Sequence, residues 1–132
     1  MFQARELFES TSTKPALDSA DRVAAVETLH DCTEAVTACA GAMVSEENLG
    51  AAVSRDMDCA DVTNAAAQLL TRGDGPDTSL LSAQLEAALV ACERSHELCS
   101  KHADHHTHCR ICSEATRACA DMCRQILNKI HA

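Results

Sequence analysis

The segment "HELCSKHADHHTHCRICSEATRACADMC", residues 96–123, holds five cysteines and five histidines within 28 residues. After "HADHH" its cysteines recur at intervals of three, seven and four residues, which is the spacing of one face of an α-helix. Before "HADHH", His96 and Cys99 are also three residues apart. The segment therefore predicts a helical hairpin, in which one helix ends near Lys101 and the next begins near Thr107.

The same periodicity extends over most of the chain and predicts four helices, at about 19–43, 47–72, 78–101 and 107–129. The breaks "SEEN" and "GDGPD" separate the first three, and Asp18 or Ser19 can cap the first. Residues 1–18 are weakly periodic, contain Pro15 and are expected to form a short N-terminal arm. Short links between long helices predict an all-α fold, an antiparallel up-down-up-down four-helix bundle over residues 19–132.

Composition agrees with one helical domain. The chain has 132 residues, with four glycines, two prolines and no run of β-branched residues, which argues against an all-β fold. It has no Trp or Tyr, and its only Phe residues are Phe2 and Phe8. The core must therefore be built from Leu, Val, Ile, Ala, Met and Cys.

Each expected helix carries one stripe of residues spaced by three or four. The stripes comprise Ala25, Leu29, Cys32, Val36, Cys39 and Met43; Ala52, Cys59, Val62, Thr63, Ala66 and Leu70; Leu81, Leu85, Ala88, Leu89, Cys92, His96 and Cys99; and Cys109, Cys112, Thr116, Cys119, Cys123, Ile126, Leu127 and Ile130. All nine cysteines lie on these stripes, so all nine are expected to face the bundle axis. Cysteine can occupy a core simply as a small apolar residue. That role accounts for one or two inward positions more easily than for nine.

Antiparallel packing gives the predicted bundle two different ends. One end, called the mouth below, collects Met43, Cys39, Cys99, His102, His105, His108 and Cys109. The other end collects the apolar residues Leu70, Leu81, Leu127 and Ile130.

Rows of inward thiols predict a particular metal. Soft thiolate and thioether ligands select Cu(I), zinc or iron–sulfur clusters. Structural zinc usually uses paired Cys-x-x-Cys knuckles, and the chain has one such motif, "CRIC". Iron–sulfur clusters need four cysteines around one inorganic core, typically on loops. Rows of thiols on straight helices therefore suit neither structural zinc nor an iron–sulfur cluster. Cu(I) accepts two or three thiolates and shares them between neighbouring ions, so the rows favour several Cu(I) ions per chain.

The histidines separate into two groups. His102, His105 and His108 at the mouth are expected to pass incoming metal to the thiols, although His105 and His106 can also be read simply as polar loop residues. His96 is either a ligand or a hydrogen-bonded core histidine, and the sequence leaves both open. His30 and His131 are expected to be ordinary surface residues.

The segments "LHDCTEAVTACA", "DMDCADVTNAAAQLL" and "CERSHELCSKHADHHTHCRICSEATRACADMCRQIL" resemble the bacterial copper storage proteins over about residues 28–128. The resemblance implies a four-helix bundle that binds many Cu(I) ions through inward cysteines and assembles as a homo-oligomer, with a tetramer favoured. It also implies cytosolic storage or buffering of copper, because "MFQARELFES" does not look like a signal peptide. A copper chaperone is the expected delivery partner.

The chain departs from the family pattern at five stripe positions. Non-cysteine residues stand where the alternating pattern would place further thiols, at Val36, Thr63, Ala88, Ser95 and Thr116. Met43 can serve as a softer ligand near the mouth. The expected ligand set is Cys32, Cys39, Cys59, Cys92, Cys99, Cys109, Cys112, Cys119, Cys123, His96, His102, His105, His108 and Met43. Its nine thiolates predict roughly four to nine Cu(I) ions per chain.

Other functions fit the sequence less well. A thiol redox sensor would need one reactive pair, most plausibly Cys109 and Cys112 near the N-terminus of the last helix. A structural interaction bundle would need no metal. The formal charge of −9 disfavours nucleic acid and anionic membranes as partners. No nucleophile–base pair, phosphate loop or paired-carboxylate motif is present, so we expect no enzyme.

Overall fold

A computed structural model describes residues 17–44, 50–72 and 78–132. Nearly all of them belong to four α-helices, α2 (Ser19–Met43), α3 (Gly50–Thr71), α4 (Ser79–Ser100) and α5 (Thr107–His131). Within these three ranges no residue is in a β-strand. The predicted all-α class is confirmed, whereas most of the expected N-terminal arm (1–16) and the links at 45–49 and 73–77 lie outside the described residues.

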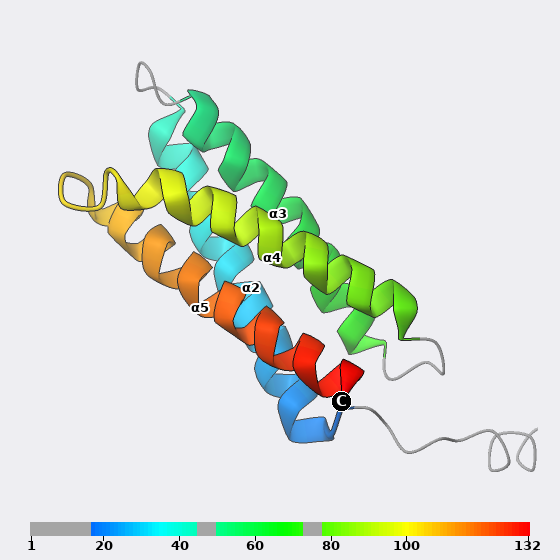
Figure 1. The fold of residues 1–132 in the computed structure, drawn as a ribbon. Helices are drawn as coiled ribbons and strands as arrows, with labels where there is room; N and C mark the ends of the chain where they lie inside the picture. The colour runs from blue at the N-terminus through cyan, green and yellow to red at the C-terminus, as the bar shows by residue number, and fades with distance from the viewer. Residues whose placement is uncertain (1–16, 45–49, 73–77) are drawn as a thin grey trace, which may run out of the picture.

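The helices form the expected closed bundle, in which each helix packs against two others (Figure 1). The neighbouring pairs are α2 with α3, α3 with α4, α4 with α5, and α5 with α2. The C-terminal ends of α2 and α4 therefore lie beside the N-terminal ends of α3 and α5. This end is the mouth, and the turn at residues 101–106 joins α4 to α5 there.

Local chemistry explains where helices begin. Asp18 caps α2, because its carboxylate accepts a hydrogen bond of 2.7 Å from the backbone N–H of Asp21. The turn between α4 and α5 is closed by its own backbone, since the N–H of His106 donates to the carbonyl of His102 at 3.0 Å. At the opposite end of the bundle, Lys129 of α5 lies 2.7 Å from Asp21 of α2. Such half-exposed pairs contribute little stability, so burial must supply most of it.

The core is graded along the bundle axis. Leu29, Leu70 and Leu85 are fully buried toward the end opposite the mouth, with Ile126 and Leu127 close by. Toward the mouth the buried residues are mostly thiols and small side chains. No helix in the described ranges is long and apolar enough to span a membrane. The buried leucine and isoleucine side chains are concentrated at one end, and most of the buried thiols lie in the middle and at the mouth.

Truncation of a buried leucine tests this division. Leu85→Ala on α4 should lower the free energy of unfolding of the metal-free protein by about 2–5 kcal/mol, because it leaves a cavity in the apolar end. Leu80→Ala on the same helix is the matched control, since Leu80 is 62% exposed. Urea unfolding followed by circular dichroism measures both, and equal losses for the two variants would contradict the graded core.

Candidate metal centre

All nine cysteines are free thiols and all are buried, none with more than 1% of its surface exposed. They come from all four helices, because the three- and four-residue spacing turns each thiol toward the axis. The sulfurs are not spread evenly. Seven of them gather in two clusters. The upper cluster near the mouth is formed by Cys39, Cys99 and Cys112 together with Asp56, and the lower cluster by Cys32, Cys59, Cys92 and Cys119.

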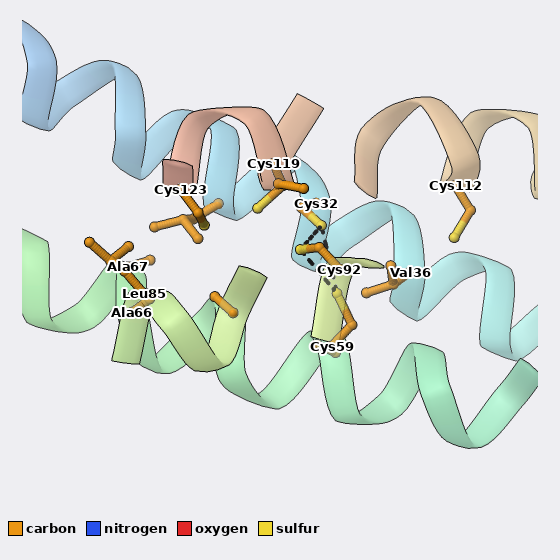
Figure 2. Close-up of a cluster of buried hydrophobic side chains, with 14 of the residues drawn as sticks. Cys32, Val36, Cys59, Ala66, Ala67, Leu85, Cys92, Cys112, Cys119 and Cys123 are labelled. Carbon is orange, nitrogen blue, oxygen red and sulfur yellow. Dashed lines mark hydrogen bonds between the residues drawn. The ribbon is translucent and has the colours of Figure 1, made fainter. Parts of the chain in front are cut away.

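The lower cluster is built around a triangle of sulfurs from α2, α3 and α4 (Figure 2). The Sγ atoms of Cys32 and Cys59 are 3.9 Å apart, those of Cys32 and Cys92 are 3.8 Å apart, and those of Cys59 and Cys92 are 3.6 Å apart. A metal ion about 2.3 Å from each of three coplanar sulfurs would hold them about 4.0 Å apart. The triangle therefore already has nearly the size of a three-thiolate metal site.

Helix α5 adds to the lower cluster. The Sγ atom of Cys119 lies within 4.8 Å of those of Cys32 and Cys92, which makes a second group of three possible ligands. Cys123 follows one turn later and belongs to the same buried core as Ala67 and Leu85, which are labelled near it in the view of Figure 2. Because the two groups of three share Cys32 and Cys92, two ions bound here would share thiolates.

The upper cluster brings three thiols and a carboxylate together. The Sγ atoms of Cys99 and Cys112 are 3.2 Å apart, and those of Cys39 and Cys99 are 3.9 Å apart. Oδ1 of Asp56 accepts from Cys99 and from Cys112, each at 3.5 Å. Possible ligand atoms of Cys39, Asp56, Cys99 and Cys112 all lie within 4.8 Å of one another. Among the groups within this limit in the described part of the chain, this one has the most members, four.

Sequence reasoning misses Asp56, because an aspartate on a helix is ordinarily assigned to the solvated face. The signal is present, since Ala52, Asp56, Cys59 and Thr63 continue the inward spacing of four, three and four residues. Ser95 donates a 2.6 Å hydrogen bond to Oδ1, while Oδ2 is buried and has no hydrogen-bond partner among the described residues. A buried carboxylate oxygen left unpaired among thiols fits a position for a bound cation.

Burial and mutual hydrogen bonds shift the pKa values of the clustered groups. Burial raises the pKa of Asp56 to about 7, and hydrogen bonds from Cys112 and Cys39 lower the pKa of the Cys99 thiol. In the lower cluster, hydrogen bonding to Cys119 raises the pKa of Cys92, and hydrogen bonding to Cys32 raises that of Cys59. Hydrogen bonding to Cys112 likewise raises the pKa of Cys39 in the upper cluster. Among these four thiols, Cys39, Cys59, Cys92 and Cys99, only Cys99 has a lowered pKa.

The mouth carries a third group of possible ligands. Nδ1 of His108 lies 3.5 Å from the sulfur of Cys39 and 3.4 Å from that of Cys109. The sulfur of Met43 lies 4.0 Å from that of Cys109, so the thioether is also in reach. Because Cys39 belongs to the upper cluster as well, this group connects the mouth to the buried thiols without a gap.

The remaining histidines lie apart from these groups. His96 is half-buried, and its ring nitrogen Nδ1 lies 2.8 Å from the carbonyl oxygen of Ser113 on α5, as expected for a hydrogen-bonded core histidine. His102 is half-buried and His105 exposed on the turn that forms the mouth. None of the three joins a ligand group in the ranges that the structure covers, and their binding of metal stays a prediction.

Comparisons with known proteins agree with this ligand chemistry. A family model described as copper storage protein matches residues 18–128. None of the curated proteins compared with the chain is similar enough to match.

Solved structures of proteins from Streptomyces lividans share the fold. The copper storage protein Ccsp, loaded with 10 copper equivalents, is 38% identical with a TM-score of 0.80, and the match covers 84% of this chain and 86% of that one. A cytosolic copper storage protein with five coppers is 38% identical with a TM-score of 0.78, covering 84% and 98%. A histidine-to-alanine mutant of Ccsp is 36% identical with a TM-score of 0.82, covering 87% and 98%.

The buried carboxyl of Asp56 predicts a pH dependence. A pKa raised from 3.8 to about 7 on folding makes the native state hold a proton that the unfolded chain has lost. The resulting stability is complete below pH 3.8 and is lost as the pH rises through about 7, by at most ~4 kcal/mol. In the metal-free protein, the unfolding free energy of the wild type should therefore fall relative to that of Asp56→Asn as the pH rises across this window.

The matched control is Asp58→Asn, an exposed position on the same helix. Urea unfolding at a series of pH values between 4 and 8 measures all three proteins. The difference between wild type and Asp58→Asn should stay constant. A constant difference for Asp56→Asn as well would show that its carboxyl does not titrate in this window.

Proposed function

Because the chain belongs to the copper storage protein family, we propose that it stores or buffers copper as Cu(I) in the cytosol. The ions are held inside the bundle by inward-facing cysteine thiolates, several to each chain. The observation that carries this proposal is the gathering of buried sulfurs from four helices at 3.2–3.9 Å, close to the spacing around one thiolate-bound ion.

Several ions follow from the way the ligands overlap. Cys39 belongs to two groups of possible ligands, and Cys32 and Cys92 are shared within the lower cluster. Soft thiolates prefer Cu(I), which is satisfied by two or three of them. We propose roughly four to nine ions per chain, held by the nine cysteines with Met43 and Asp56 as additional ligands. The Streptomyces lividans structure with five coppers supports a number in this range, and the one loaded with 10 copper equivalents lies just above it.

Copper is proposed to enter at the mouth. His108 lies between the sulfurs of Cys39 and Cys109, so an ion bound there needs only one exchange of ligands to reach the upper cluster. His102 and His105 on the adjoining turn are proposed to receive the ion first. Imidazole suits this role because it is a weaker ligand for Cu(I) than thiolate and releases the ion inward.

The setting of the protein is also a proposal. A cytosolic location is supported by the solved cytosolic copper storage protein with which the chain is 38% identical. The excess of acidic residues, a formal charge of −9, favours cations over nucleic acid or anionic membranes as partners. A copper chaperone is the proposed donor, and a homo-oligomer, favoured as a tetramer, is the proposed assembly. Storage requires no catalysis, so we propose no enzymatic activity.

Removal of the upper cluster tests the storage role. Anaerobic titration with Cu(I) against a chromophoric chelator should show several ions bound to each wild-type chain. The triple variant Cys39→Ser, Cys99→Ser, Cys112→Ser should lose about half of them, because half of the buried ligand groups are gone. Ile111→Ser is the control, since Ile111 is 48% exposed beside Cys112 and its loss removes no ligand. Fewer than one ion per wild-type chain would refute the proposal.

Replacement of the mouth imidazole separates entry from storage. His108→Ala should slow the uptake of Cu(I) several-fold yet leave the number of ions at equilibrium nearly unchanged, because the buried thiols remain. His30→Ala, an exposed histidine far from the mouth on α2, should change neither. Stopped-flow absorbance during anaerobic mixing with a Cu(I)–chelator complex gives the rate. An unchanged uptake rate for His108→Ala would place the entrance elsewhere.

A further inference from the structure

The two buried clusters are separated by the same distance on three of the four helices. Cys32 and Cys39 on α2, Cys92 and Cys99 on α4, and Cys112 and Cys119 on α5 are each seven residues apart. Seven helical residues rise about 10.5 Å, too far for one ion to contact both members of a pair. These three helices therefore carry no thiol between the upper and the lower cluster that could bind copper on its way.

The layer between the clusters lacks ligands for soft metal on the same three helices. Its residues are Val36, Ser95 and Thr116, all fully buried. The hydroxyl of Ser95 donates to Asp56 at 2.6 Å, and that of Thr116 donates to the carbonyl of Cys112 at 2.8 Å. An apolar side chain and two occupied hydroxyls offer little to Cu(I), which prefers sulfur. The layer therefore obstructs transfer of copper along the axis.

Helix α3 is different, because it carries one ligand for each cluster on adjacent turns. Asp56 accepts from Cys99 and Cys112 in the upper cluster, whereas Cys59 lies 3.9 Å and 3.6 Å from the sulfurs of Cys32 and Cys92 in the lower one. Asp56 and Cys59 are three residues apart, a rise of about 4.5 Å. In the view of Figure 2, Val36 lies between the lower triangle and Cys112.

We propose that Cys59 is a relay ligand, the one thiol through which Cu(I) passes from the upper cluster to the lower cluster. The core is then two compartments in series, and the upper compartment fills before the lower. This inference rests on the proposed copper storage, but it concerns the order and rate of filling rather than the ability to bind.

Ligand exchange explains why one thiol can control the step. A Cu(I) ion without ligands would be a bare charge in a buried, largely apolar layer, which is strongly unfavourable. If the Cys59 thiolate binds before an upper thiolate is released, the ion keeps at least two ligands throughout. The incoming thiol gives up its proton and the released thiolate takes one up, so the step conserves charge and involves no oxidation.

A matched pair of variants tests the relay. Cys59→Ser and Cys32→Ser each remove one sulfur of the lower triangle, and so each should reduce the copper capacity by a similar amount. Stopped-flow loading of wild type with Cu(I) from a chelator should show a fast phase and a slow phase. Cys59→Ser should slow the second phase about tenfold or more, since a barrier raised by about 1.4 kcal/mol has that effect. Cys32→Ser should leave its rate nearly unchanged.

A thiol added to the intervening layer gives the converse test. Thr116→Cys should restore the slow phase of the Cys59→Ser variant and should speed that phase in the otherwise wild-type chain. The second measurement does not depend on the folding of Cys59→Ser. It also separates a relay from a structural effect. A relay changes the rate at which the lower cluster fills and leaves the capacity of that cluster unchanged.

The possible results divide clearly. A wild type that binds no copper refutes the proposed storage function itself. A wild type that binds several ions in one indivisible phase, or equal slow-phase rates in Cys59→Ser and Cys32→Ser, leaves storage standing but overturns the relay. A slow phase that is unaffected by Thr116→Cys in both backgrounds also overturns it. Slowing in Cys59→Ser together with rescue by Thr116→Cys supports it.

Discussion

The seven-residue repeat of thiols on antiparallel helices is the constraint on which the rest of the structure depends. A helix returns nearly to the same face after seven residues, so Cys32 and Cys39 point to the same axis from α2. Thiols with the same spacing on α4 and α5 meet them at two levels, with Cys92 and Cys119 near Cys32, and Cys99 and Cys112 near Cys39. The register of four helices thereby converts a linear pattern into two compact ligand groups.

This use of the core has a cost in packing. A thiol buries less apolar surface than a leucine, and the buried Asp56 opposes folding unless it is protonated or bound to a cation. The fully buried leucines at the end opposite the mouth offset part of this deficit. Bound metal would supply more, because ligand binding to the native state alone raises stability. The bundle therefore combines a stabilising end with a binding end.

Much of this could be predicted from the sequence, and the reason is periodicity. Spacing alone places all nine cysteines inward, which the burial of each thiol confirms. What spacing cannot supply is the axial register between helices. The contact of Cys99 with Cys112, and the assignment of Cys59 to the lower rather than the upper cluster, depend on how far α3 and α5 slide along their neighbours. Asp56 is not predicted, because an aspartate is assigned to the solvated face of a helix even where its spacing places it on the inward stripe.

The departures from a full thiol pattern then acquire a physical meaning. Three of them, Val36, Ser95 and Thr116, lie in one layer rather than being scattered, and each is completely buried. Scattered losses would weaken every site a little, whereas losses confined to one layer divide the core while leaving both ligand groups intact. Cys59 on α3 is the lower-cluster thiol that follows the upper-cluster Asp56 by three residues. A core interrupted at this layer keeps both ligand groups, and under the proposed relay the interruption changes the rate at which copper moves between them.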